Sequence, residues 1–203
     1  MRTAAGGGTP VHDRPLRADA RRNRARVLDA AREVFAQDGH EAQMDEIARA
    51  AKVGVGTVYR HFPTKEGLIA ALVADSFERI SDAAILALEA EDPWDAFAGV
   101  LWYGAEILAS NRGVTEALAV MPTVKQATPQ VERLHITVAE LIRRAQEAGV
   151  LRPDVCVDDV PMLMCGIGAA TRRPHSCNRS WRRHLTIVLD GMRAQAATGK
   201  LPD

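Results

Sequence analysis

The chain has 203 residues, of which 47% are hydrophobic and 26% are charged, a composition typical of a globular protein of one or two domains. Its 26 basic residues balance its 26 acidic residues, and its three cysteines are too few for a disulfide framework. We find no apolar run near the ~18 residues that a membrane helix needs and no secretory leader, so we expect a cytoplasmic protein without a membrane partner.

The charge is unevenly distributed along the chain. Residues 1–65 carry 12 Lys and Arg against 8 Asp and Glu, whereas residues 66–203 carry 14 against 18. The first 26 residues alone hold seven Arg and two Asp. A basic front and an acidic body indicate that only the front meets a polyanion, although a solvated, disordered tail has the same composition.

The first third of the chain predicts an arm followed by short helices. Residues 1–20 contain three consecutive Gly and two Pro without an apolar period, which predicts a flexible basic arm. From residue 21 the apolar spacing is helical, and we expect the first helix to end at Gly39. A shorter stripe from residue 44 to 51 predicts a second helix.

Two further helices follow closely. A glycine-containing break at 52–54 precedes a third helix over 55–62, which Pro63 ends. Thr64 stands where an N-cap belongs, and it opens a fourth helix that we expect to run to about residue 80.

The remainder also has helical periodicity, and no alternating apolar and polar run predicts a strand. We therefore expect an all-α protein of about nine helices, in which residues 21–80 form a small three-helix domain and residues 81–203 form a helical body. The predicted helices of the body cover about 93–108, 114–121, 131–149, 154–170 and 180–197.

The segment 44–65 has the helix-turn-helix pattern, with the helix-turn-helix itself at about 43–62 and a second helix able to enter a major groove. If Val58 and Phe62 point into the core, Gly56 and Arg60 point directly away, because residues four apart share a face of a helix. An ordinary three-helix module with a solvated surface remains the alternative at this point.

The outward residues have chemistry suited to DNA. Gly56 allows close approach of the backbone, and the hydroxyls of Thr57 and Tyr59, like Lys65, suit phosphate oxygens. Arg60 and His61 are within reach of base edges, and Arg60 is the strong candidate for a bidentate contact to guanine.

These residues resemble a known family. The stretches VLDAAREVFAQDGH (27–40), MDEIARAA (44–51) and VGVGTVYRHFPTKEGL (53–68) are similar to the DNA-binding domain of tetracycline-repressor-like (TetR/AcrR) transcriptional regulators. Residues 149–154 and 181–185 resemble the family more weakly. The resemblance implies an all-helical homodimer that binds a palindromic operator in double-stranded DNA, and a repressor released by a small-molecule effector.

By this resemblance Val55, Gly56, Thr57, Tyr59, His61 and Lys65 fall on DNA-contacting positions. Gln43 departs from the pattern, because many members have Thr at the start of the second helix, and Gln is a poor N-cap. An amide at this position is still able to donate a hydrogen bond to phosphate.

The resemblance also places an effector pocket and a dimer interface in the body. Apolar residues on helices that would surround a cavity are Trp102, Met121, Leu134, Val138, Leu163 and Ile167. Glu106 and His135 lie near these faces as possible polar contacts, although a solvated position fits both. We expect the last two helices to pair across a two-fold axis, small residues against large, although both helices packing within one chain is the alternative. The interface residues expected are Gly166, Gly168, Ala169, Ala170, Leu185, Val188, Leu189 and Met192.

Other classes of function find little support. The chain has no G-x-S-x-G, P-loop or H-E-x-x-H motif, so we expect no enzyme and no cofactor. Cys165, His175, Cys177 and His184 do not match a zinc-ligand spacing, and we expect no metal. A helical protein that sequesters a small apolar ligand without regulating DNA remains the alternative.

Overall fold

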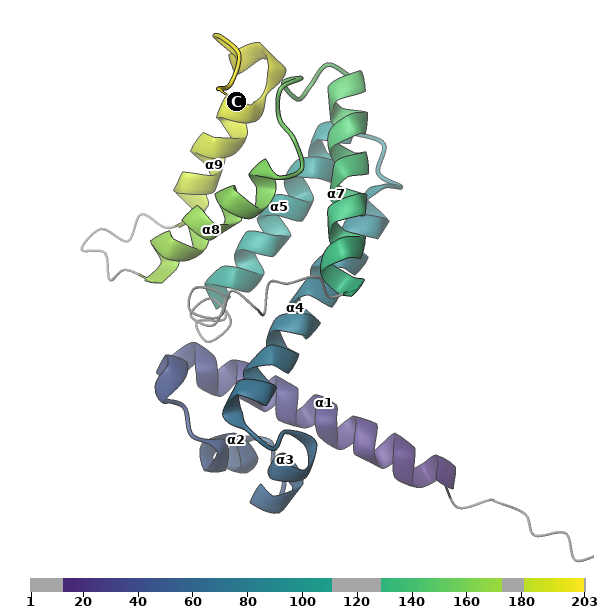
Figure 1. Ribbon diagram of the computed structural model, residues 1–203, viewed down its shortest axis with the longest axis vertical. Coiled ribbons are helices and arrows are strands. Elements are labelled where there is room, and N and C mark those ends of the chain that lie inside the picture. The colour runs from purple at the N-terminus through teal and green to yellow at the C-terminus, as the bar shows by residue number, and fades with distance from the viewer. Residues whose placement is uncertain (1–12, 111–128, 173–180, 203) are drawn as a thin grey trace, which may run out of the picture.

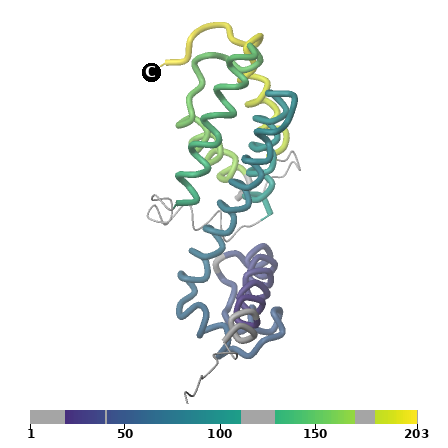
Figure 2. Tube along the Cα trace, turned by 90° about the vertical axis from the view of Figure 1, so that its right-hand side faces the viewer, coloured from purple at the N-terminus to yellow at the C-terminus, as the bar shows by residue number. Residues whose placement is uncertain are grey.

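The computed structural model describes residues 13–110, 129–172 and 181–202. Over these ranges the chain forms eight α-helices and no β-strand, and its β-type pairing is an isolated bridge between Leu151 and Arg193. The predicted all-α class is confirmed. Figures 1 and 2 show two parts in line along the long axis: a small N-terminal head and a larger helical body. No helix in these ranges is long and apolar enough to cross a bilayer.

The head consists of α1 (Asp13–Asp38), the 3-10 turn η1 (Gly39–Glu41), α2 (Met44–Ala50) and α3 (Val55–His61), closed by the start of α4 (Lys65–Ala87). Gly39 has a φ of 56°, which suits glycine and ends α1 as predicted. One apolar cluster fills the head, and its largest fully buried members are Phe35, Ile47, Leu68 and Leu72.

The first helix begins earlier than the sequence predicts. Residues 13–20, expected to be part of a flexible arm, are the first turns of α1. Pro15 is compatible with this because the N–H groups of the first turn have no partner within a helix, and proline lacks that group. The flexible arm predicted from the glycine and proline content of residues 1–20 is therefore too long, because residues 13–20 are helical.

The fourth helix joins the two parts of the molecule. It runs unbroken to Ala87, past the end expected near residue 80, and packs along α7 in the body (Figure 1). Small residues are buried in this added length, namely Ser81 and Ala84. Near the head, the guanidinium of Arg32 lies 2.5 Å from the carboxylate of Asp75 and ties α1 to α4.

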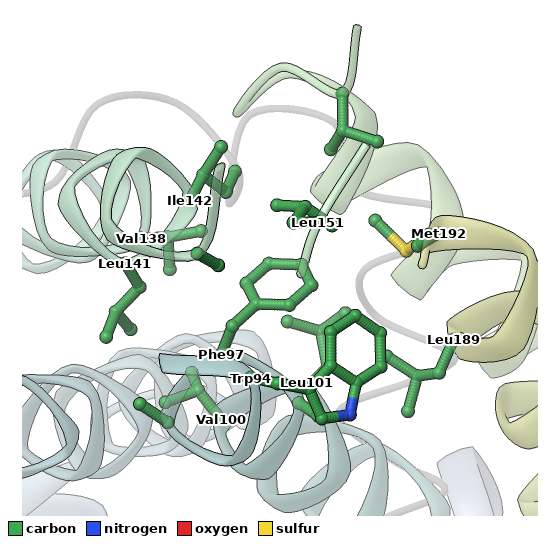
Figure 3. Packing of buried hydrophobic residues seen from close by; sticks show 14 of the residues in the cluster. Trp94, Phe97, Val100, Leu101, Val138, Leu141, Ile142, Leu151, Leu189 and Met192 are labelled. Carbon is green, nitrogen blue, oxygen red and sulfur yellow. The ribbon is translucent and has the colours of Figure 1, made fainter. Parts of the chain in front are cut away.

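The body contains α5 (Pro93–Ser110), α7 (Pro129–Glu147), α8 (Asp159–Arg172), α9 (Trp181–Met192) and the 3-10 turn η3 (Ala194–Ala196). Phe97 lies at the centre of its core, with residues of α7, α9 and the chain near Leu151 closing around it (Figure 3). The helix expected over 114–121 lies outside the described residues.

Two helices of the body differ from their predicted bounds. Helix α8 starts at Asp159 rather than 154, because the ion pair of Arg152 with Asp154 and the bridge at Leu151 hold the preceding residues in turns. Helix α9 ends at Met192 rather than 197, since Arg193 forms the other side of that bridge.

Candidate nucleic-acid interface

Helix α3 presents the face that the sequence predicts. Val58 and Phe62 are buried at 0% and 3% exposure, whereas Tyr59 is 45% exposed and Gly56 and Arg60 are exposed as well. The expectation that Gly56 and Arg60 point away from the core is confirmed. The exposed side of this short helix therefore combines an aromatic hydroxyl, a guanidinium and a glycine with room for close approach.

Thr57 and His61 are less accessible than their neighbours. Both are half-buried, and the Nε2 atom of His61 is buried without a hydrogen-bond partner among the described residues. The His61 ring packs near that of Phe62, with centroids 6.4 Å apart. That His61 reaches a base edge stays a prediction, and in the structure its ring is partly covered by protein.

Contacts from α1 fix the position of α3, and the sequence did not single them out. A guanidinium nitrogen of Arg26 donates to the carbonyl of Ala51 at 2.8 Å, in the turn between α2 and α3. The guanidinium of Arg24 lies over the ring of Phe62, 5.4 Å from its centroid. In the same turn Lys52 has a φ of 56°, so the chain reverses through a left-handed residue that is not glycine.

The ends of the neighbouring helices flank this face. Gln43 is exposed at the start of α2, and its amide donates to the carbonyl of Glu41 at 2.7 Å. The carboxylate of Glu46 accepts from the backbone N–H of Gln43 at 2.9 Å, so a side chain of α2 itself provides the acceptor for this N–H at the helix N-terminus. Thr64 caps α4 as predicted, accepting from the N–H of Gly67 at 3.0 Å, and Lys65 is half-buried beside it.

The described residues expected to line an effector pocket lie in or at the edge of the body core. Val138 and Ile167 are buried in the core of the body, at 4% and 0% exposure. Leu134 and Leu163 pack against the same core from its edge. Met121 lies outside the described residues. That Val138 and Ile167 line an effector pocket stays a prediction, since apolar spacing alone does not separate a cavity wall from a solid core.

A groove does lie between α5 and α9, with a volume of about 310 Å³. Trp94 and Trp102 line it from α5, and Asp190 and Arg193 line it from the other side. The guanidinium of Arg193 lies 4.0 Å from the ring centroid of Trp94. Trp102 is thus the member of the expected pocket set that reaches this groove.

The two polar residues considered for that pocket are directed elsewhere. Both carboxylate oxygens of Glu106 accept from Arg182, at 2.9 and 2.8 Å, in an exposed ion pair. His135 is exposed on α7. Of the residues weighed as metal ligands, Cys165 and His184 are exposed, and His175 and Cys177 lie outside the described residues.

The expected dimer interface divides into two sets. Leu185, Leu189 and Met192 are at most 6% exposed and belong to the core of their own chain, so for these three residues the expectation is wrong, while pairing of the last two helices across a two-fold axis stays a prediction. An amphipathic stripe does not specify which element covers it. Val188 and Ala170 are partly buried, Gly168 is buried, and Gly166 and Ala169 are exposed on α8.

Large apolar residues accompany that exposed face of α8. Met162 on α8 is 74% exposed, and Ile187 on α9 is 60% exposed. Large apolar side chains left in water on neighbouring helices are typical of a surface that another protein covers. This surface replaces the buried stripe of α9 as the candidate interface.

Comparison with known proteins agrees with this architecture. Residues 27–72 match the family model described as bacterial regulatory proteins, tetR family, and residues 92–194 match the C-terminal domain of SbtR-like transcriptional regulators. A crystal structure of the TetR transcription regulatory protein from Mycobacterium vanbaalenii is similar over 88% of this chain and 99% of that one, at 38% identity and a TM-score of 0.66.

Curated relatives point the same way. The chain is 29% identical to the HTH-type transcriptional regulator UidR of Escherichia coli strain K12 over 146 residues, 69% of this chain and 74% of UidR. It is 44% identical to the HTH-type transcriptional repressor KstR of Mycolicibacterium smegmatis over 71 residues, 33% of this chain and 35% of KstR.

Proposed function

The chain belongs to the TetR family of bacterial regulatory proteins and is a DNA-binding transcriptional regulator, and we propose that it is a homodimeric repressor released from its operator by a small molecule. The observation that carries the proposal is the face of α3, where Tyr59 and Arg60 are exposed while Val58 and Phe62 anchor the helix from behind. The repressor named KstR supports repression, since it is similar to this chain over 71 residues.

Arg60 is the residue proposed to read sequence. Its guanidinium is exposed on the helix that enters the major groove, and a bidentate contact to guanine contributes about 1–3 kcal/mol of discrimination. Val55, Thr57, Tyr59 and Lys65 are proposed to contact the backbone and position the helix. Gln43 is a weaker candidate for a phosphate contact, because its amide already donates to Glu41.

Selection from a random duplex pool tests the proposal, and a gel shift with DNA upstream of the chain's own gene tests it independently. We expect enrichment of a palindrome with half-sites about 10 base pairs apart. Arg60→Ala should relax base preference at one position of each half-site, whereas Lys65→Ala should weaken all sequences alike. If no duplex is enriched and none is shifted, the alternative of a ligand-sequestering protein is favoured.

The effector is proposed to bind in the body. The groove between α5 and α9, at about 310 Å³, falls within the range of small-molecule sites and has the indoles of Trp94 and Trp102 on one side. A thermal-shift screen should find compounds that stabilise the protein. An effector that releases the protein from DNA weakens operator binding by some factor, and by linkage the operator must weaken effector binding by the same factor. Trp102→Ala should abolish both effects.

A further inference from the structure

The buried face of α1 changes character along the helix. Leu28, Ala31 and Phe35 lie on this face and are 0–3% exposed in the core of the head. Arg24, Arg21, Arg17 and Arg14 precede Leu28 by four, seven, eleven and fourteen residues, which places all four positions on the same face of the continuous helix. The face that is apolar over the core therefore continues as a row of arginine positions, here termed the arginine row.

The arginine row lies beyond the end of the head. Figure 1 shows the N-terminal turns of α1 extending past α2 and α3. The side chains of Arg21 and Arg24 are exposed, and Arg24 reaches the ring of Phe62 at the end of α3. The row thus extends beyond α3, on the same face of α1 that packs against the core of the head.

Two contacts hold α1 against the turn before α3 and the end of α3. Arg26, one turn after Arg22, donates to the carbonyl of Ala51 at 2.8 Å and fixes α1 to the turn before α3. Together with the contact between Arg24 and Phe62, this bond sets the orientation of the row relative to α3. The row is part of the same folded unit as the helix that enters the groove.

The carboxylate of Asp19, in this part of α1, lies on another face of the helix. Asp19 forms an ion pair with Arg22, three residues later. At about 100° per residue, Asp19 is about 160° and Arg22 about 100° around the helix from Arg21, so both lie off the arginine row. The carboxylate of Asp19 is therefore placed to neutralise Arg22 rather than the row. Seven Arg against two Asp in residues 1–26 leave this segment strongly basic.

We propose that the arginine row is a second DNA-contacting surface, which binds the phosphate backbone beside the groove that α3 enters. We infer DNA as the partner from the charge and the position of the row. The arginines continue a face that is apolar over the core, and their positive charge is complementary to the phosphates of DNA. Positions 14 to 24 span roughly 15 Å of helix, enough to reach several phosphates of one strand. The row adds affinity without reading sequence, and the proposal rests on the DNA-binding function proposed above.

Salt dependence on two duplexes tests this: one selected from a random pool with the wild-type protein, and one unselected duplex of equal length. Removing an arginine that binds one phosphate should reduce the slope of log K against log salt by about 0.9 and weaken binding at 0.1 M salt by about eightfold. We expect Arg21→Gln to show this effect on both duplexes, and the triple variant R14Q, R17Q and R21Q to show a larger one.

Arg22→Gln is the matched control, because it removes the same charge from the adjacent residue on a different face. It should keep the wild-type slope. Equal reductions for Arg21→Gln and Arg22→Gln, or an unchanged slope in the triple variant with an unchanged melting temperature, would overturn the proposal. These outcomes are distinct from failure of the DNA-binding function itself, in which the wild-type protein enriches no duplex and binds neither one.

Discussion

The Nε of Arg133, in the second turn of α7, donates to the Oγ of Ser81 on α4 at 2.8 Å, and another nitrogen of the same guanidinium contacts Asp82 at 2.6 Å. Ser81 is fully buried, whereas Asp82 is exposed. Because α4 is one unbroken helix from the head into the body, this contact joins the body directly to the helix that carries the head. We therefore expect a change in the body that moves α7 to move α4 through this contact.

Arg133→Met should therefore affect both stability and DNA binding. Leaving the buried hydroxyl of Ser81 without its donor should lower the free energy of unfolding by about 1–2 kcal/mol. Operator affinity should change by about 2- to 30-fold, the range seen for mutations that modulate coupling. Asp82→Asn, which removes only the exposed pair, should cost about 0.5 kcal/mol or less. Urea unfolding and gel shifts measure both, and an operator affinity unchanged by Arg133→Met contradicts the role in coupling.

Phe97 is the second test, because it lies at 0% exposure in the centre of the body core (Figure 3). Phe97→Ala removes its ring from contacts with several helices and should lower the free energy of unfolding by about 3–5 kcal/mol. Leu86→Ala is the control, since Leu86 is 69% exposed on α4 and its truncation should change stability by about 0.5 kcal/mol at most. Similar effects in the two variants would show that this core is not well packed.

The parts of the structure predicted from sequence depend on local information. The exposed face of α3 was predictable because Val58 within this seven-residue helix, and Phe62 directly after it, are buried on one side, which leaves Gly56 and Arg60 on the other. The stop at Gly39 is equally local.

The remainder depends on contacts between residues far apart in the chain. The end of α4 was missed because the residue buried against α7 is Ser81, which no apolar pattern reports. The stripe of Leu185 and Leu189 was recognised, but its partner was assigned wrongly, since periodicity does not identify the covering surface. The groove beside Trp94 likewise depends on where α9 packs.

The pair of Arg152 and Asp154 makes stability depend on pH. Two contacts from Arg152, at 2.6 and 2.9 Å, and the N–H of Leu201, at 2.7 Å, hold the pKa of the Asp154 carboxyl well below its usual range. The unfolded chain binds a proton at this residue near pH 4, and the folded chain binds it only at lower pH. The stabilisation is therefore present above about pH 4 and is lost as pH falls toward the folded pKa.

We expect Asp154→Asn to melt below the wild-type protein at pH 7, with the difference shrinking between pH 4 and lower values. Melting temperatures measured from pH 7 to pH 3 give this comparison. The exposed neighbour Asp158 supplies the control, and Asp158→Asn should melt close to wild type at every pH. A difference between wild type and Asp154→Asn that stays constant down to pH 3 contradicts the argument.

The exposed apolar face of α8 and α9 predicts where two copies meet. Ile187→Glu, alone or with Met162→Glu, places a charge on this face and should raise the dimer dissociation constant by about tenfold or more, because an unpaired charge is costly to bury. Ile136→Glu on α7 is the control, since Ile136 is 63% exposed on another helix. Light scattering after size exclusion measures the molar mass. A dimer that survives both substitutions places the interface elsewhere.

Gly56 separates stability from DNA binding. A Cβ atom at this position meets nothing within 4 Å in the protein, and alanine is favoured over glycine within a helix by about 0.5–1 kcal/mol. Gly56→Ala should therefore raise the free energy of unfolding, yet weaken operator binding, because the added methyl group stands on the face proposed to lie against the bases. A stabilising substitution that reduces binding cannot act through damage to the fold.

Gly191→Ala is the matched control for this last comparison. Gly191 is also helical and exposed, and its Cβ would likewise meet nothing within 4 Å, but it lies on α9 at the far end of the body. It should stabilise the protein by a similar amount and leave operator affinity unchanged. Urea unfolding and fluorescence anisotropy on the same preparations provide both quantities. If Gly56→Ala binds the operator as tightly as Gly191→Ala, the backbone of α3 does not approach the bases at this residue.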